Sequence, residues 1–466
     1  MTNSLHNWKN HADNLKLGLR FALIVFTLVV MGRVMTQALG DLRSYPGIDL
    51  RVKVGSARLL IRGMNPYADF RHESLPDHLR PLNEDTYSPP LLVLYSPLCE
   101  LPWKLQRIIY FCADWIAILL CFVVVSRVFP KNIVLALWLG FVLLFVAAPG
   151  FRLHLERGQY YIELALLISL ASVNSIHKRD SWLHALPLAL LVLFRPTYAI
   201  CILCLLILRR VRLAVIAACL CAMLFALMLP LAGIRDWKNY LQEIRFNQLE
   251  TADAAYASAP APPSPAQSQI VEGIDFSRSL TYPGYLADRT LTGVAESSVS
   301  PFMARLIHRI APSVPDFRRI NTAGLLLACL FDVVVMYGFS RKCGGGLIPT
   351  AFLFLAPLNL EFFAPQHFAY CDVTILAPTL LVIAAILEIS RRVGWVIYSV
   401  ILMIGAVLPY FAVHFNKHVP MASFFSYVGV LAILNLVCLV EAWGSQRFLV
   451  RFAVTGRKQI GDCATV

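Results

Sequence analysis

The sequence has few charged residues and lacks the short motifs that mark several common enzyme classes. Charged residues make up 15% of its 466 residues, whereas soluble domains contain about one quarter. It contains no HExxH, GxSxG or P-loop segment, so nothing indicates zinc-peptidase, serine-hydrolase or nucleotide-hydrolysing chemistry. Paired CxxC motifs and an internal repeat are also missing, and the 12 cysteines lie mostly in apolar runs, where cysteine acts as a small hydrophobe.

Long apolar runs are what the sequence does have. Hydrophobic residues make up 58% of the chain, and the mean hydropathy is +0.65. The apolar residues form blocks close to the length of a membrane span. We therefore predict one all-α polytopic membrane domain over residues 1–466, with about 11–12 transmembrane or re-entrant helices. The expected segments are 17–40, 107–129, 132–149, 159–175, 182–194, 197–208, 213–232, 320–341, 346–363, 371–390, 394–414 and 420–443.

Two of these segments, 182–194 and 197–208, are too short to cross a bilayer alone. They flank Arg195-Pro196, and a proline breaks a helix because it removes a backbone donor and clashes with the preceding turn. A broken backbone is tolerated in a membrane where protein or a water-filled cavity covers it. The pattern predicts two half-length helices that form a hairpin entering and leaving from one face.

The net charge of +13 reports orientation rather than nucleic-acid binding. The basic residues fall in short loops between apolar runs, without a basic stripe that carries interleaved aromatic residues. In the predicted topology these loops share one side, which the positive-inside rule places in the cytoplasm. Two long segments, 41–106 and 235–318, then face outward. The second contains an Ala/Pro/Ser run at 254–269, so we expect it to be flexible.

Several polar side chains are expected near the outer face, where they would surround one cavity. They are Asp49, Tyr87, His154, Arg157, Gln159, Glu361 and His367, with Arg195 reaching the same level from the tip of its hairpin. An arginine fork binds phosphate, and a carboxylate can take the proton of an attacking hydroxyl. This combination suits a phosphate-bearing amphiphile together with a hydroxyl nucleophile.

Each candidate also has a simpler interpretation. Asp49 could be a solvated loop acid or a helix N-cap, and Tyr87 could belong to an ordinary turn. Gly158-Gln159 could cap a helix, and Arg195 could snorkel to the interface or pair with Glu163. His367 could be an interfacial histidine. Because no DxD-like pair lies near Asp49, we expect neither a metal nor a cofactor.

The order of these motifs resembles glycosyltransferase family 87, membrane enzymes of the GT-C architecture that use polyprenyl-phosphate sugars. The first outer loop of that family reads approximately Asp-aromatic-x-Val-Tyr, followed by an Ala-rich helix, Gly-x-x-Pro-Tyr and Tyr-x-Pro-Pro. A Gly-Gln pair, a basic-Pro pair, an Asn-Gln-Ser-Leu-x-Gly motif and a late histidine follow. The matching positions here are Asp49–Lys53, Gly63–Tyr67, Tyr87–Pro90, Gly158-Gln159, Arg195-Pro196, Asp288–Gly293 and His367.

The chain departs from the family pattern at three places. Lys53 stands where Tyr is usual, Tyr160-Tyr161 replaces the polar residue after Gly-Gln, and Asp288-Arg289 replaces Asn-Gln. These departures affect the identity of the sugar and of the acceptor more than the reaction class.

The resemblance implies a GT-C-like bundle and the transfer of one mannose-like hexose or pentose from a polyprenyl-phosphate donor to a lipid or glycan hydroxyl. The reaction would invert the anomeric centre, with Asp49 as general base. Arg195, His367, Gln159 and His154 would bind the donor phosphate, and Tyr67, Tyr87, Arg157 and Glu361 would bind substrate. The expected protein is a monomer in a bacterial inner membrane whose site faces the periplasm.

Three alternatives remain open at this stage. One is another GT-C enzyme, of the aminoarabinose or protein-mannose transferase type, in which Asp41 would compete with Asp49 as the base. Another is a transporter of lipid-linked substrates, although no pair of interrupted helices occurs in two matching halves. The third is a membrane subunit without catalytic activity.

Overall fold

The structure is a computed structural model, and it describes most of the apolar part of the chain. The described residues are 18, 21–22, 24–40, 42, 47–67, 87–129, 134–142, 151, 154–155, 157–177, 180–244, 270–271, 274–275, 317–342, 346–363, 369–408 and 421–444. Asp41, His367, the Ala/Pro/Ser run and the motif at 288–293 lie outside them.

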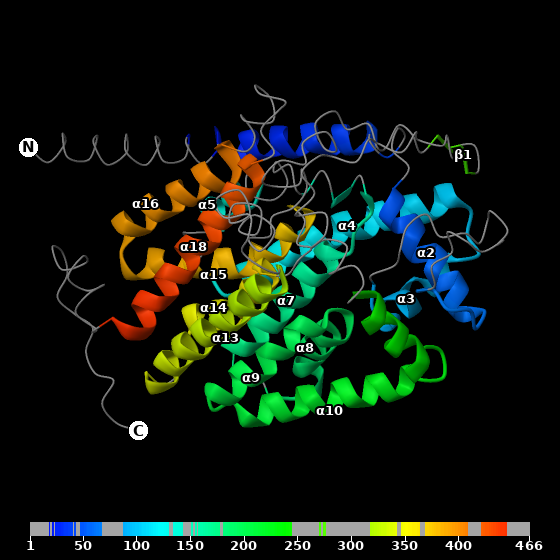
Figure 1. Cartoon of the computed structure of the whole chain (residues 1–466). Helices are drawn as coiled ribbons and strands as arrows, with labels where there is room; N and C mark the ends of the chain where they lie inside the picture. The colour runs from blue at the N-terminus through cyan, green and yellow to red at the C-terminus, as the bar shows by residue number, and fades with distance from the viewer. Residues whose placement is uncertain are drawn as a thin grey trace, which may run out of the picture.

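The described residues are almost entirely helical (Figure 1). The first half contains a helix at Ile24–Gly40, then α2 (Ile48–Ile61), α3 (Pro89–Tyr95), η2 (Ser96–Leu98), α4 (Trp103–Ser126), α5 (Val134–Phe141), α7 (Tyr161–Ile176), α8 (Trp182–Phe194), η4 (Pro196–Tyr198), α9 (Ala199–Ile207) and α10 (Val211–Met228). The second half contains α13 (Phe317–Arg341), α14 (Leu347–Phe362), η6 (Ala369–Ile375), α15 (Leu376–Ile389), α16 (Arg391–Leu402), a π-helical turn at Met403–Val407 and α18 (Met421–Trp443). Two-residue strands β1 (Ile270–Val271) and β2 (Ile274–Asp275) pair antiparallel.

Each apolar segment predicted from the sequence contains a helix. Four described helical segments have the length and composition of membrane spans, namely Trp103–Ser126, Val211–Met228, Asn321–Arg341 and Cys371–Ile389. Shorter apolar helices fill the other predicted positions. The protein is an all-α polytopic membrane protein, as its composition predicted.

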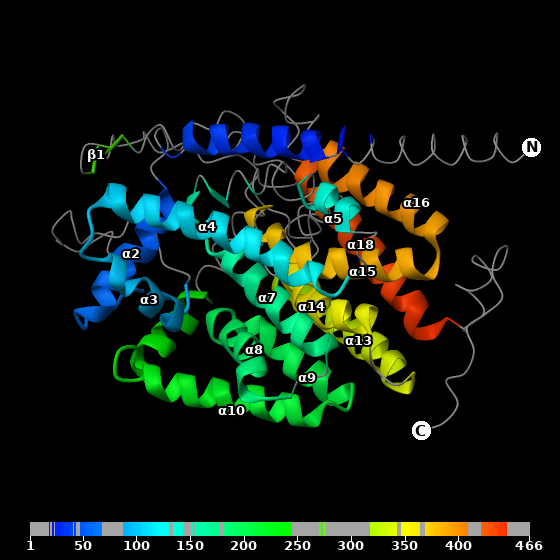
Figure 2. The same cartoon turned by 180° about the vertical axis from the view of Figure 1, so that it is seen from behind.

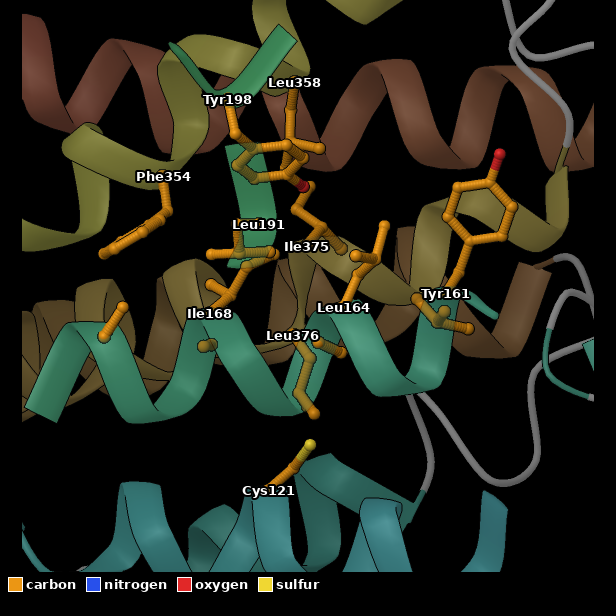
Figure 3. Packing of buried hydrophobic residues seen from close by; sticks show 14 of the residues in the cluster. Cys121, Tyr161, Leu164, Ile168, Leu191, Tyr198, Phe354, Leu358, Ile375 and Leu376 are labelled. Atoms are coloured by element: carbon orange, nitrogen blue, oxygen red, sulfur yellow. The ribbon is translucent and has the colours of Figure 1, made fainter. Parts of the chain in front are cut away.

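Helix α7 lies at the centre of the bundle. It packs against α4, α8, α14, α15 and η6, and it lies in the middle of the molecule in both opposite views (Figures 1 and 2). Figure 3 shows Leu164 and Ile168 of α7 among the buried apolar side chains of the core, with Tyr161 at one end of the helix. The apolar faces of neighbouring helices therefore hold α7 in place, and its first turn has a fixed position.

The chain breaks between α8 and α9 where the sequence predicted. Arg195 is extended (φ −143°, ψ 97°) and Pro196 opens the short helix η4. Arg195 bonds Tyr161 at the start of α7, whereas Arg210, after α9, bonds Ser175 near the end of α7 and Asp180 beyond it. The chain has thus returned to the end of the bundle from which α8 started, so α8, η4 and α9 form the predicted hairpin.

The bundle has two chemically different ends. At one end, Arg210 pairs with Asp180, and Lys342 donates to the carbonyls of Glu441 and Gly444. The opposite end carries α2, the start of α7 and the hairpin tip. There the ring of Tyr240, which follows α10, packs against Tyr67 with centroids 5.7 Å apart and the ring planes tilted by 54°, so the two long segments that the sequence predicts to face outward contact each other.

Candidate functional site

Asp49 lies in the first turn of α2 at the end of the bundle that carries the hairpin tip. The helix starts after Gly47, which has left-handed backbone angles (φ 58°, ψ 56°). A Cβ at Gly47 would approach within 2.6 Å of the Arg107 guanidinium, so glycine allows the chain to pass close to α4. An acid in the first turn is favoured by the positive end of the helix dipole.

The carboxylate of Asp49 accepts hydrogen bonds from two neighbouring side chains. Arg157 binds it through two nitrogens, with Nε on Oδ2 and Nη2 2.9 Å from Oδ1. Gln159 Nε2 donates to Oδ2 at 2.5 Å. Asp49 is 6% exposed, and the Arg157 side chain is 30% exposed. Since a carboxylate has about four acceptor positions, these three bonds leave room for one more donor.

The turn at Gly158 brings Arg157 and Gln159 to Asp49. Gly158 has φ +72°, and a Cβ there would come within 2.7 Å of Leu50 Cβ. The Gly158 N–H donates to the His154 carbonyl at 2.8 Å, which caps the short helix that ends at Arg157. Glycine therefore serves both the left-handed conformation and the close approach to α2.

The Gly63–Tyr67 turn is connected to Gln159 by a chain of hydrogen bonds. The Asn65 side chain accepts a bond from the Tyr67 N–H at 3.1 Å, which is an Asx turn. The Tyr67 hydroxyl donates to the Tyr87 carbonyl at 2.8 Å, and the Tyr87 hydroxyl donates to Gln159 Oε1 at 3.2 Å. Tyr67 and Tyr87 therefore orient the amide that contacts Asp49.

Arg195 lies in a second polar group at the hairpin tip. Its Nε donates to Glu361 Oε1 of α14, and Thr197 donates to the same oxygen at 2.8 Å. Nη1 donates to the hydroxyls of Tyr161 at 2.6 Å and Tyr160 at 3.3 Å. The pairing of Arg195 with Glu163 considered above is wrong, because Glu361 takes that place.

Tyr160 connects the two polar groups. Its ring packs edge-on against Tyr87 with centroids 5.6 Å apart, and its hydroxyl accepts the bond from Arg195. Ser88, next to Tyr87, donates to the Phe194 carbonyl at 3.0 Å, directly before Arg195. The Asp49 group and the Arg195 group are therefore parts of one site.

Lys53 lies one helical turn beyond Asp49 on the same face of α2. Its side chain is fully buried, and Nζ donates to the Gly158 carbonyl at 2.5 Å. Four tyrosine rings surround the ammonium with centroids at 4.8–5.6 Å, which is the range of cation–π contacts. They are Tyr95, Tyr110, Tyr87 and Tyr160.

Lys53 also lies near a group of three titratable side chains. The group consists of Asp114 of α4, His154, and Glu163 of α7, and each offers one possible metal-ligand atom within 4.8 Å of the others. His154 Nε2 accepts bonds from the backbone N–H groups of Tyr161 and Ile162 at 3.0 and 3.2 Å. Burial and the charge of Lys53 lower the pKa of His154, so the ring is neutral near pH 7.

A neutral histidine that accepts at Nε2 carries its proton on Nδ1. Nδ1 lies 3.9 Å from Asp114 Oδ2. This tautomer has no lone pair to offer a metal at either nitrogen. The group therefore suits a buried charge cluster with Lys53 better than a metal centre.

The structure brings together most of the residues selected from the sequence. The Asp49 group holds Tyr67, Tyr87, Arg157 and Gln159, and the Arg195 group holds Glu361. His154 supports the backbone of α7, and His367 lies outside the described residues. No described contact tests the catalytic or binding role proposed for any of them.

The sequence interpretation missed the complete burial of Lys53 and its contacts with four tyrosine rings. Lys53 follows Asp49 by four residues, a spacing that places both on one face of a helix. That spacing was available in the sequence. The tyrosine rings around the ammonium could not be predicted, because they come from positions between Tyr87 and Tyr160, in other segments of the chain.

Chemically, the site offers two buried carboxylates, Asp49 and Glu361, each paired with an arginine, and several tyrosine hydroxyls. A carboxylate can accept a proton, and arginines can stabilise an anionic leaving group.

Residues 86–332 match the model of glycosyltransferase family 87. No curated protein and no solved structure matches the chain.

Proposed function

Since the chain belongs to glycosyltransferase family 87 and is thus a membrane glycosyltransferase, we propose that it transfers one sugar from a polyprenyl-phosphate donor to a hydroxyl of a lipid or glycan. We further propose that it lies in a bacterial inner membrane, with the Asp49 end facing the periplasm. The feature that carries the proposal is one buried carboxylate, Asp49, connected to the partly buried Arg195 through hydrogen bonds of Gln159, Tyr87 and Tyr160 and one contact between the two tyrosine rings.

The reaction proposed is a single displacement at the anomeric carbon. Asp49 takes the proton of the acceptor hydroxyl, and the oxygen attacks the carbon while its bond to the phosphate oxygen breaks. The configuration inverts, and polyprenyl phosphate leaves with one more negative charge. A general base contributes about 10²- to 10⁴-fold to such a step.

Arg195 is the residue proposed to stabilise the leaving phosphate. Its guanidinium is always charged and can hold two phosphate oxygens. Glu361, Tyr160 and Tyr161 hold it in one orientation, so little reorganisation is needed when charge develops. Arg157, whose side chain is 30% exposed, is proposed to contact the sugar and the acceptor together with Gln159, Tyr67 and Tyr87.

The test uses purified protein in liposomes with acceptor lipids extracted from bacterial membranes. Short-chain polyprenyl phosphates carrying radiolabelled mannose, glucose, galactose or arabinose serve as donors. We expect transfer from at least one of them, and Asp49→Asn should lower the rate about 10²- to 10⁴-fold with unchanged expression. Arg195→Gln should lower both the rate and the affinity for the donor.

Two variants serve as controls. Asp180→Asn removes the carboxylate of another Arg–Asp pair, at the opposite end of the bundle, and should keep the rate. Asp41→Asn tests the rival base and should also keep the rate, because the proposal assigns proton transfer to Asp49. Full activity of Asp49→Asn would disprove the role of Asp49, and absence of transfer from all four donors would contradict the proposed donor class.

A further inference from the structure

The fully buried Lys53 is the feature of this site that the proposed reaction does not use. A lysine side chain is almost never fully buried unless its charge is paired. Here the burial is complete, and the residue lies one turn from the proposed base on the same helix. Such a costly arrangement needs a physical reason.

The first part of that reason is the bond from Lys53 to the Gly158 carbonyl at 2.5 Å. Gly158 lies between Arg157 and Gln159, the two residues that donate to Asp49. Tyr110 adds a second bond to the same turn by donating to the Gln159 carbonyl. The ammonium group therefore holds the backbone from which both partners of Asp49 extend.

The second part is the negative charge that two neighbouring carboxyl groups, Asp114 and Glu163, place near the ammonium group. Asp114 and Glu163 lie within electrostatic range of Lys53 and within hydrogen-bonding reach of each other. An ammonium group beside two buried carboxyl groups offsets part of the cost of burying their charge. One proton shared between the two carboxyl groups would make the set of three neutral.

The third part is the ring of tyrosines. Aromatic faces attract a cation within about 6 Å of their centroids, and four tyrosines meet that condition around Nζ. Two of them, Tyr87 and Tyr160, belong to the network that joins Asp49 to Arg195. The position of the ammonium is thus tied to both parts of the site.

We propose that Lys53 is a positioning residue for Asp49. Its ammonium group ties the Gly158 turn, and with it Arg157 and Gln159, to the carboxylate, and Asp114 with Glu163 supplies the charge that keeps the ammonium in place. The proposal rests on the function proposed for Asp49, since positioning matters only if this carboxylate takes part in the reaction.

The test compares Lys53→Met, Lys53→Arg and the double variant Lys53→Met/Glu163→Gln in the liposome transfer assay, together with thermal unfolding in detergent. Methionine keeps an apolar stem but has neither the charge nor the donor. We expect Lys53→Met to lower kcat about 10- to 100-fold, the range of a misplaced catalytic group, with a smaller change in KM. Lys53→Arg should recover part of kcat.

The double variant separates positioning from folding. Removing one negative charge with the positive one should restore the unfolding temperature toward that of the parent protein, while kcat stays low because the Gly158 carbonyl still lacks its donor. If kcat recovers together with the unfolding temperature, Lys53 acts only through stability and the proposal is wrong. Full activity of Lys53→Met would also overturn it.

Asp49→Asn, measured in the same assay, separates the proposed role of Asp49 as base from the proposed role of Lys53 in positioning it. Full activity of that variant refutes the base and removes the basis for positioning. Loss of activity in Asp49→Asn with full activity in Lys53→Met refutes only the inference about Lys53.

Discussion

Gly158 is the residue on which the geometry of the site depends most directly. Its left-handed backbone ends one short helix, and its missing Cβ lets the turn contact Leu50 of α2. The same turn supplies the carbonyl for Lys53 and the two donors for Asp49. A side chain at this position would act on all these contacts at once.

Gly158→Ala should therefore destabilise the protein and lower the transfer rate together. The new Cβ would lie 2.7 Å from Leu50 Cβ, and alanine at positive φ costs about 1 kcal/mol or more. Thermal unfolding in detergent and the transfer assay measure both effects.

The matched control for this change is Gly55→Ala on α2. Nothing lies within 4 Å of the Cβ that Gly55 would gain. Glycine in a helix interior is less stable than alanine by about 0.5–1 kcal/mol, so this variant should unfold at the same or a higher temperature with unchanged rate. Equal loss in both variants would contradict the role given to the Gly158 turn.

At the level of single residues, the polarity of the side chains predicted which residues belong to the candidate site, but not which residues they contact. Asp49, Gln159 and Arg195 stand out because polar groups near apolar runs are costly and usually functional. Their partners could not be predicted, since Asp49 and Arg157 are 108 residues apart and Arg195 and Glu361 are 166 apart. Only tertiary packing brings such pairs together.

Among the elements, α3 is the helix whose N-terminus contacts the hairpin tip. Pro89 and Pro90 occupy the first turn of α3, where proline costs no backbone hydrogen bond. Ser88, directly before the helix, donates to the carbonyl of Phe194 at the end of α8. This bond satisfies a carbonyl at the point where the helix breaks, and it aligns the two elements.

Ser88→Ala should cost about 0.5–1.5 kcal/mol, the net value of one buried hydrogen bond, and should weaken donor binding because Arg195 follows Phe194. The matched control is Ser96→Ala, whose hydroxyl bonds only the local Val93 carbonyl among the described partners. Unfolding temperature and donor KM in the liposome assay check the pair. No difference between the two variants would count against a coupling of α3 to the hairpin.

The hairpin was predictable from one dipeptide, whereas the arrangement of α2 and α3 was not. Pro196 breaks the helix whatever surrounds it, and the flanking apolar runs were each too short to span. Residues 91–103 are mostly apolar and are interrupted by Pro97 and Pro102, and such a pattern predicts short helices but not the elements that they contact. Those neighbours depend on tertiary hydrogen bonds, such as the bond from Ser88 to Phe194 and the bond from Tyr67 to Tyr87.

At the scale of the whole molecule, one end of the bundle carries short basic loops and the other carries the candidate site. The apolar periodicity and the loop charges predicted this division, because bilayer thickness and the positive-inside rule act on sequence directly. The centre of the bundle was less predictable. Helix α7 looks like any other apolar segment, and its central place follows from packing against five elements.

The two ends give a direct test of orientation with single cysteines. Arg62 lies at the end of α2, and Arg212 lies at the start of α10, and both side chains are exposed. If the basic loops face the cytoplasm, a membrane-impermeant maleimide should label Arg62→Cys in intact spheroplasts and label Arg212→Cys only after permeabilisation. The parent protein gives the background from native cysteines, of which Cys112 and Cys219 are exposed within apolar helices. Labelling of Arg212→Cys in intact spheroplasts would reverse the orientation, and the acceptor hydroxyl would then have to be supplied from the cytoplasm.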